Sequence, residues 1–201
     1  IKRGKIKKVD ITNIEKEVVK VRNVTEPMNV NQGKLSLGFR TNTSSNDEDY
    51  YALMVYNGIL GGGIHSKLFQ NVREKASLAY YVFSRLEKFK GLMIISSGIE
   101  TENKDKAIDI ILSQMDEIRK GNISDYEYDS TLKAIETGIK SLKDNQLQMV
   151  DFYLSQAIVN TDDNFETLNE KIKKVSKQDV VEVSKKIKLD TIYFLTSKVQ
   201  Q

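Results

Sequence analysis

Three consecutive glycines at positions 61–63 separate two amphipathic segments and restrict how the chain can continue. The segment before them ends at Leu60, and the shorter segment after them places Leu68, Phe69 and Val72 on one side. Because glycine tolerates backbone angles that other residues avoid, we expect the glycines to end one helix and to turn the chain. Residues 78–86, which follow the second segment, are typical of a strand. The sequence therefore predicts a helix, a short helix and a strand in close succession.

Two polar side chains lie on either side of the predicted junction between the short helix and the strand. Arg73 is placed near the end of the helix, and Tyr80 near the start of the strand. On the residues alone, the ordinary structural interpretation is that Arg73 pairs with a nearby acid and that Tyr80 packs in the sheet. The alternative is that the two side chains form part of a site.

The residues before the glycines predict strands and one helix. Residues 17–24 are a candidate strand, and residues 25–31, which contain Pro27, are expected to be an irregular connection. Apolar and polar residues alternate over residues 33–41, which predicts a half-buried strand. Ser45 and Glu48 have the spacing of a capping box, so a helix is expected from there to Leu60.

The residues after the junction predict a hairpin, a group of helices and a last strand. Strands at 80–86 and 92–99 flank a turn, and the second strand is apolar on both faces, which predicts a central place in the sheet. Apolar residues then recur at helical spacing from Ala107 onward. Helix boundaries are indicated by Gly121 and by the capping-box pairs Ser124–Glu127 and Ser176–Asp179. Residues 191–195 are expected to return to the sheet as a strand.

This order of elements predicts an α+β fold, in which a mostly antiparallel sheet has helices packed on one face. The 201 residues suit a single domain that spans positions 1–201. Residues 1–13 are polar and typical of a linker.

Composition excludes several classes of protein. The net charge of +3 comes from 31 basic and 28 acidic residues that are interspersed, so no surface for nucleic acid or for a membrane is expected. No apolar run approaches the ~20 residues of a membrane span. The chain has no cysteine and one histidine, which excludes a thiolate metal site and a multi-histidine site within it. A site made of carboxylates alone stays open, although no spacing indicates one. The absence of cysteine suits a reducing compartment, and we expect a cytoplasmic location.

The glycine-rich turn allows two further interpretations. His65 is expected to be a solvated or capping side chain, with a substrate contact as the alternative. A phosphate-binding loop requires G-x-x-x-x-G-K-[ST] after a strand. Gly58 and Gly63 have the right spacing, but Ile64 stands where the lysine must be, and a helix precedes them. Phosphate binding is therefore not expected.

Residues 61–80 resemble a run found in the pitrilysin/insulinase family of zinc peptidases, which includes the mitochondrial processing peptidase. In bacterial members, the second half of the chain carries GGG-x-x-S-[KR]-L-F-x-x-[VI]-R-E-K-x-x-L-A-Y. Here it reads Gly61-Gly62-Gly63, Ser66-Lys67-Leu68-Phe69, Val72-Arg73-Glu74-Lys75 and Leu78-Ala79-Tyr80, without a gap. The flanking pattern over residues 32–196 also fits. The chain thus resembles the C-terminal half-domain of a bacterial member.

The resemblance implies a division of labour between two halves. The family's zinc ligands come from an H-x-x-E-H motif in the first half, which this chain lacks, so zinc is expected in an N-terminal half or a partner subunit. In active members an Arg and a Tyr at this spacing reach across to that site. The resemblance therefore implies that Arg73 binds the substrate backbone and that Tyr80 is both substrate-binding and catalytic, stabilising the tetrahedral intermediate. Tyr81 is expected on the opposite face of the strand, and Glu74 and Lys75 are expected to be structural or surface charges.

Three functions are compatible with these observations. The first is the substrate-binding, non-zinc-bearing half of a bacterial zinc metallopeptidase, with the peptide held as an added strand at a sheet edge. The second is a non-catalytic homologue that binds peptide or assembles with an active partner. The third is an α+β binding module unrelated to proteolysis. The presence of Arg73 and Tyr80 favours a substrate contact over a purely architectural role. The chain alone is expected to be inactive.

Overall fold

The computed structural model describes residues 17–197, so the predicted linker at residues 1–13 lies outside the described residues. Within the described part, five strands form one sheet in the order β1-β5-β2-β4-β3. Their bounds are β1 Arg22–Met28, β2 Gly33–Arg40, β3 Ala79–Glu87, β4 Leu92–Ile99 and β5 Lys188–Ser197. β1 and β5 pair in parallel, whereas the other three pairings are antiparallel. The prediction of a mostly antiparallel sheet with a central second hairpin strand is confirmed.

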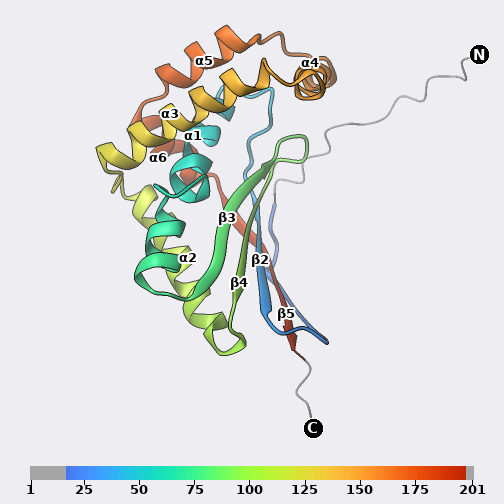
Figure 1. The fold of residues 1–201 in the computed structure, drawn as a ribbon, viewed down its shortest axis with the longest axis vertical. Helices are drawn as coiled ribbons and strands as arrows, with labels where there is room; N and C mark the ends of the chain where they lie inside the picture. The colour runs from blue at the N-terminus through green and yellow to red at the C-terminus, as the bar shows by residue number, and fades with distance from the viewer. Residues whose placement is uncertain (1–16, 198–201) are drawn as a thin grey trace, which may run out of the picture.

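The helices gather on one face of this sheet, as Figure 1 shows, which confirms the predicted α+β fold. Their bounds are α1 Tyr50–Gly61, α2 Lys104–Arg119, α3 Asp125–Leu142, α4 Gln146–Val159, α5 Phe165–Lys174 and α6 Lys177–Lys185. The structure also has two short helices, the π-helical η1 Phe69–Lys75 and the 3₁₀-helical η2 Thr101–Asn103. The capping boxes predicted at Ser124 and Ser176 are both formed.

The core lies between the sheet and the helical layer, with α1 at its centre. Strand β2 turns Leu35, Leu37 and Phe39 inward, because side chains two residues apart share one face of a strand. The facing helix α1 buries seven of its twelve residues. Each fully buried Leu or Phe contributes roughly 1.5–3 kcal/mol relative to an exposed one, so this layer is the main stabilising contact of the domain.

Helix α1 approaches β3 so closely that a side chain cannot fit between them. A Cβ atom added at Gly61 would lie 2.5 Å from the backbone nitrogen of Ser84. The hydroxyl of Ser84 in turn donates to the carbonyl oxygen of Asn57 at 3.1 Å. None of the three glycines has a positive φ. Among the described residues, the glycines with a positive φ are Gly91 and Gly121. The expectation that the triple glycine supplies unusual backbone angles was therefore wrong, and for Gly61 the requirement is close approach.

The start of the domain also differs from the sequence prediction. Strand β1 includes Pro27 and begins after most of the predicted strand at 17–24. Proline is tolerated there because β1 is at the edge of the sheet that residues 17–197 form, where one row of its backbone N–H groups faces no other strand of this range. The predicted capping box at Ser45 and Glu48 is wrong, since α1 begins at Tyr50 and its N-cap Asp49 makes no side-chain cap. Asp47 instead accepts from the backbone N–H of Ser44, so these polar residues form a turn before the helix.

An ionic contact joins three neighbouring strands. Asp190 of β5 accepts from Arg40 of β2 at 2.8 Å and from Arg22 of β1 at 3.2 Å. The Thr191 hydroxyl also donates to this carboxylate at 2.5 Å. These donors, the threonine hydroxyl foremost and then Arg40, lower the pKa of Asp190 to about 2. The carboxylate of Asp190 therefore keeps its charge at lower pH than an ordinary aspartate does.

We expect Gly61→Ala to destabilise the domain by roughly 1–3 kcal/mol, because overpacking forces α1 away from β3. Gly138→Ala, in the exposed interior of α3, is the matched control because a Cβ atom there would meet nothing within 4 Å. That change should stabilise the helix by up to ~1 kcal/mol. Urea unfolding measures the change in the free energy of unfolding for both variants. Equal changes in the two variants would contradict the close packing of α1 against β3.

We expect the contribution of Asp190 to disappear in acid. Its folded-state pKa lies below the ordinary value of 3.8, so the stabilisation is present above about pH 4 and is lost as the pH falls towards 2. Asp190→Asn should lower the free energy of unfolding by about 1–2 kcal/mol at neutral pH, allowing for solvent screening, and should flatten its dependence on pH in that window. Asp109→Asn, at an exposed position in α2, should change it by no more than ~0.5 kcal/mol. Urea titrations between pH 2 and pH 7 make the comparison.

Candidate functional site

The short helix η1 brings Arg73 to the surface. Its winding is wider than that of an α-helix, since the N–H of Ala76 bonds the carbonyl of Asn71 at 3.2 Å, five residues back. Leu68 and Val72 are fully buried, which anchors one side of the segment against the core. Arg73 is consequently turned outward. The sequence predicted a short helix here but not its π-helical winding, a form that occurs often at functional sites.

The guanidinium of Arg73 is exposed and only lightly held. Its side chain is 44% exposed, and its Nε lies 3.7 Å from Glu74 Oε1. The guanidinium carbon lies 4.8 Å from the centre of the Phe69 ring, a distance at which cation–π attraction orients the group. Arg73 does pair with a neighbouring acid, as the ordinary interpretation expects, but the distance to Glu74 is long for an ion pair. The guanidinium carries five N–H donors, and 44% of the side chain is open to solvent.

A β-bulge turns Tyr80 outward at the start of β3. Ala79 pairs with Ile99 and Tyr81 pairs with Gly98, so Tyr80 is an extra residue on its strand. The side chain of Val82 faces the helices, and strict alternation would bury Tyr80 beside it. Instead, Tyr80 is 59% exposed. The structural alternative, in which Tyr80 packs within the sheet, does not describe this position.

Tyr81 lies on the face of the sheet away from the helices. Its ring stacks on that of Phe83 with centroids 6.0 Å apart, and it lies against Gly98, where an added Cβ atom would come within 2.5 Å of the ring. The expectation that Tyr80 and Tyr81 face opposite ways assumed an unbroken alternation. The bulge interrupts that alternation and leaves both tyrosines exposed.

Arg73 and Tyr80 line the same surface hollow, which has a volume of about 380 Å³. Its other lining residues are Glu74, Ser77, Leu78, Ala79 and Glu100. The Tyr80 hydroxyl donates a hydrogen bond to Glu100, and this bond, with the charge of Glu100, raises the pKa of Tyr80. Sequence reasoning missed Glu100. The hairpin register was the available signal, because Glu100 directly follows the residue that pairs with Ala79.

His65 is buried, so the expectation of a solvated or capping side chain was wrong. Only 7% of the residue is exposed, and its Nε2 lies 3.0 Å from the Thr131 hydroxyl of α3. Burial lowers the pKa of His65, which favours the neutral ring. The adjacent Lys67 is also buried and pairs with Glu127 at 2.9 Å. The His65–Thr131 and Lys67–Glu127 contacts therefore hold the turn after α1 against α3.

The described residues do not fit a zinc ion. Among residues 17–197, no three His, Cys, Asp or Glu side chains are grouped so that they could hold a metal ion. The sequence has no cysteine, and its single histidine bonds Thr131. Structural and catalytic zinc sites use three or four such ligands, which residues 17–197 do not bring together.

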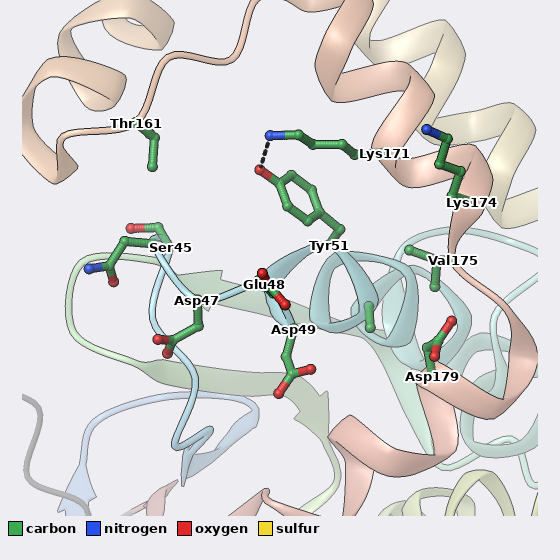
Figure 2. Close-up of a pocket in the computed structure, with 12 residues that line it drawn as sticks. Ser45, Asp47, Glu48, Asp49, Tyr51, Thr161, Lys171, Lys174, Val175 and Asp179 are labelled. Atoms are coloured by element: carbon green, nitrogen blue, oxygen red, sulfur yellow. Dashed lines mark hydrogen bonds between the residues drawn. The ribbon is translucent and has the colours of Figure 1, made fainter.

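A second hollow, of about 490 Å³, lies beside the turn that precedes α1 (Figure 2). It contains several carboxylates, but most of these have structural partners: Asp47 bonds Ser44, Asp49 pairs with Lys186, and Asp179 caps α6. On its far side, Lys171 donates to the Tyr51 hydroxyl at 3.0 Å. The contacts of Asp49 with Lys186 and of Lys171 with Tyr51 link the start of α1 to the end of α6 and to α5.

No helix among residues 17–197 combines the length and the apolar character needed to cross a bilayer.

Comparison with known proteins gives concordant results. The family model of the peptidase M16 inactive domain matches residues 2–135. A probable inactive metalloprotease, YmfF of Bacillus subtilis, is 41% identical over 179 residues, which is 89% of this chain and 42% of that protein. The uncharacterized zinc protease YmxG of the same organism is 29% identical over 122 residues, which is 60% of this chain and 30% of that protein.

A solved structure shows the same fold. The crystal structure of a conserved protein from Enterococcus faecalis superposes with a TM-score of 0.86 and 33% identity, covering 91% of this chain and 43% of that one. The chain thus spans less than half the length of these relatives. With a family model that matches most of its length, the chain belongs to the peptidase M16 family as an inactive-type domain, and the resemblance read from residues 61–80 is confirmed.

Proposed function

We propose that this chain is the substrate-binding, non-zinc-bearing half of a zinc-dependent metallopeptidase that hydrolyses peptide bonds. Zinc would be held by an N-terminal half or by a partner subunit. The observation that carries the proposal is the shared hollow of Arg73 and Tyr80, which come from two different elements and are both exposed. A guanidinium donates to carbonyl oxygens, and a phenol can donate or accept, so the pair suits a peptide backbone.

The relatives support a second half in the assembly. This chain accounts for 42% of YmfF and 30% of YmxG, so each of those proteins is long enough to contain another domain of similar size. YmxG is described as a zinc protease, which is consistent with zinc outside the part matched here. A bacterial source and a cytoplasmic location remain predictions.

The catalytic part of the proposal concerns Tyr80. Its phenol would donate to the substrate oxygen on which negative charge develops, a contribution that is strongest in the transition state. The phenol has one hydrogen, which it donates to Glu100 in this structure. Tyr80 must therefore leave Glu100 before it can act in this way.

A second candidate function is a non-catalytic homologue that binds peptide or assembles with an active partner. The description of YmfF, the 41% identical relative, as a probable inactive metalloprotease favours it. The two candidates differ in the complementary half. An H-x-x-E-H motif in that half would support the peptidase, and its absence there and in any partner would support the non-catalytic homologue.

We expect the isolated chain to retain no stoichiometric zinc after dialysis against a weak chelator, because it offers one buried histidine and no cysteine. The assembly with the complementary half should retain zinc under the same conditions. Metal analysis by mass spectrometry distinguishes the two samples. Stoichiometric zinc in the isolated chain would place ligands here and contradict the proposed division of labour.

We expect Arg73→Ala and Tyr80→Phe to impair peptide cleavage by the assembled halves in different ways. Loss of Arg73 removes a contact to the bound peptide and should raise KM, whereas loss of the Tyr80 hydroxyl should lower kcat. Removal of one oxyanion donor costs roughly 100- to 1,000-fold in other enzymes, which sets the scale for Tyr80. Both side chains are exposed, so the free energy of unfolding should change by only ~0.5 kcal/mol. Steady-state kinetics and urea unfolding provide the two measurements.

Two neighbouring residues serve as matched controls for these variants. Lys75→Ala removes a charge from the end of η1, and Tyr81→Phe removes a hydroxyl next to Tyr80, but neither residue lines the hollow. Both should leave kcat and KM nearly unchanged. If the four variants cleave peptide at the same rate as the unmodified assembly, Arg73 and Tyr80 have no role in the reaction.

A further inference from the structure

The hydrogen bond between Tyr80 and Glu100 fixes which way the phenol can interact with a ligand. An ionised carboxylate accepts hydrogen bonds and cannot donate them. The single phenolic hydrogen of Tyr80 is therefore directed at Glu100. In this arrangement, the phenol oxygen presents its lone pairs to the hollow and acts as an acceptor.

Glu100 is held in place by its backbone. It directly follows β4, whose last residue Ile99 pairs with Ala79, so the hairpin places Glu100 beside the bulged Tyr80. Its carbonyl oxygen accepts from the N–H of Asn103 at 3.0 Å, which starts η2. The carboxylate thus projects from the junction of a strand and a short helix. The phenol, although exposed, has a fixed partner.

Arg73 supplies the opposite hydrogen-bonding character at the same hollow. A guanidinium has donors and no acceptor, and its acidic contact is Glu74 at 3.7 Å. Beside the carboxylates of Glu74 and Glu100, the hollow therefore presents a donor, Arg73, and an uncharged acceptor, Tyr80. A backbone peptide group has the complementary pair, a carbonyl oxygen and an N–H.

We propose that Glu100 is a positioning residue that keeps Tyr80 as an acceptor, so that the hollow selects a peptide segment with a free backbone N–H. The proposal rests on the proposed function, because it assumes that a peptide occupies the hollow. Proline or an N-methylated residue at the contacted position would be disfavoured, since neither has an N–H. The Tyr80 hydroxyl can either accept from a substrate N–H or donate to a developing oxyanion. While substrate binds, the charge of Glu100 favours the accepting arrangement.

The contact itself is tested by the ionisation of Tyr80 in the full chain. Phenolate absorbance is followed against pH, and the Tyr80 signal is obtained by subtracting the curve of Tyr80→Phe. Glu100→Gln should shift the Tyr80 ionisation to lower pH, towards that of an ordinary tyrosine. Glu102→Gln, which removes the other carboxylate that acts on Tyr80, should shift it less. An ionisation that Glu100→Gln leaves unchanged would overturn the proposal.

The selectivity is tested with the assembled halves and a fluorescent peptide from β-casein. A series of singly N-methylated versions identifies the position where loss of the N–H weakens binding, by an expected factor of roughly 3 to 10. Tyr80→Phe should abolish that penalty, because it removes the acceptor. Glu100→Gln should reduce the penalty, whereas Glu102→Gln should retain it. A purely structural role of Glu100 would not produce this pattern.

The outcomes separate this inference from the proposed function. If the unmodified peptide binds and Arg73→Ala weakens its binding, but no N-methylation penalty depends on Tyr80 and Glu100, the positioning role is wrong and the substrate-binding role stands. If the peptide does not bind the assembly, or binds it independently of Arg73, the proposed function itself fails.

Discussion

The contact between the end of α1 and strand β3 determines where the candidate site can form. Gly61 lies against the backbone of Ser84, and this approach fixes the start of the turn that leads through η1 into β3. Arg73 and Tyr80 both lie on that connection, between two points that are anchored in the core. Their separation is therefore set by packing at some distance from either side chain, which allows both residues to remain exposed.

The bulge at Tyr80 allows β3 to bury Val82 and Ser84 while Tyr80 stays exposed. Strand β3 must turn Val82 and Ser84 towards the helices, and regular alternation would then place Tyr80 in the core as well. One extra residue leaves Tyr80 without a paired residue on β4 and exposed, while Val82 and Ser84 stay buried. The same shift brings the phenol beside Glu100, so the hydrogen-bonding state of Tyr80 is a consequence of the local backbone.

Periodic patterns predicted the regular parts of the fold, because burial on one face leaves a clear signal. The alternation in β2, the apolar strand β4 and the capping boxes before α3 and α6 were all correct. Features that depend on contacts between distant residues were not predictable in this way. The glycines, the burial of His65 against Thr131 and the role of Glu100 each depend on a neighbour far along the chain. The motif at residues 61–80 identified Arg73 and Tyr80, but it contains no information about Glu100.

The position of β5 has a consequence for synthesis on the ribosome. Among residues 17–197, this last strand lies between β1 and β2 and is the only strand that pairs with β1, so β1 stays unpaired within this range until β5 is made. A nascent chain can form the hairpin of β3 and β4 and the helices that follow, but the edge strand must wait for nearly the whole domain to emerge. Closing such a long loop is slow compared with local folding. Strand β1 and the edge of β2 that later pairs with β5 are therefore the surfaces that a chaperone would need to shield during translation.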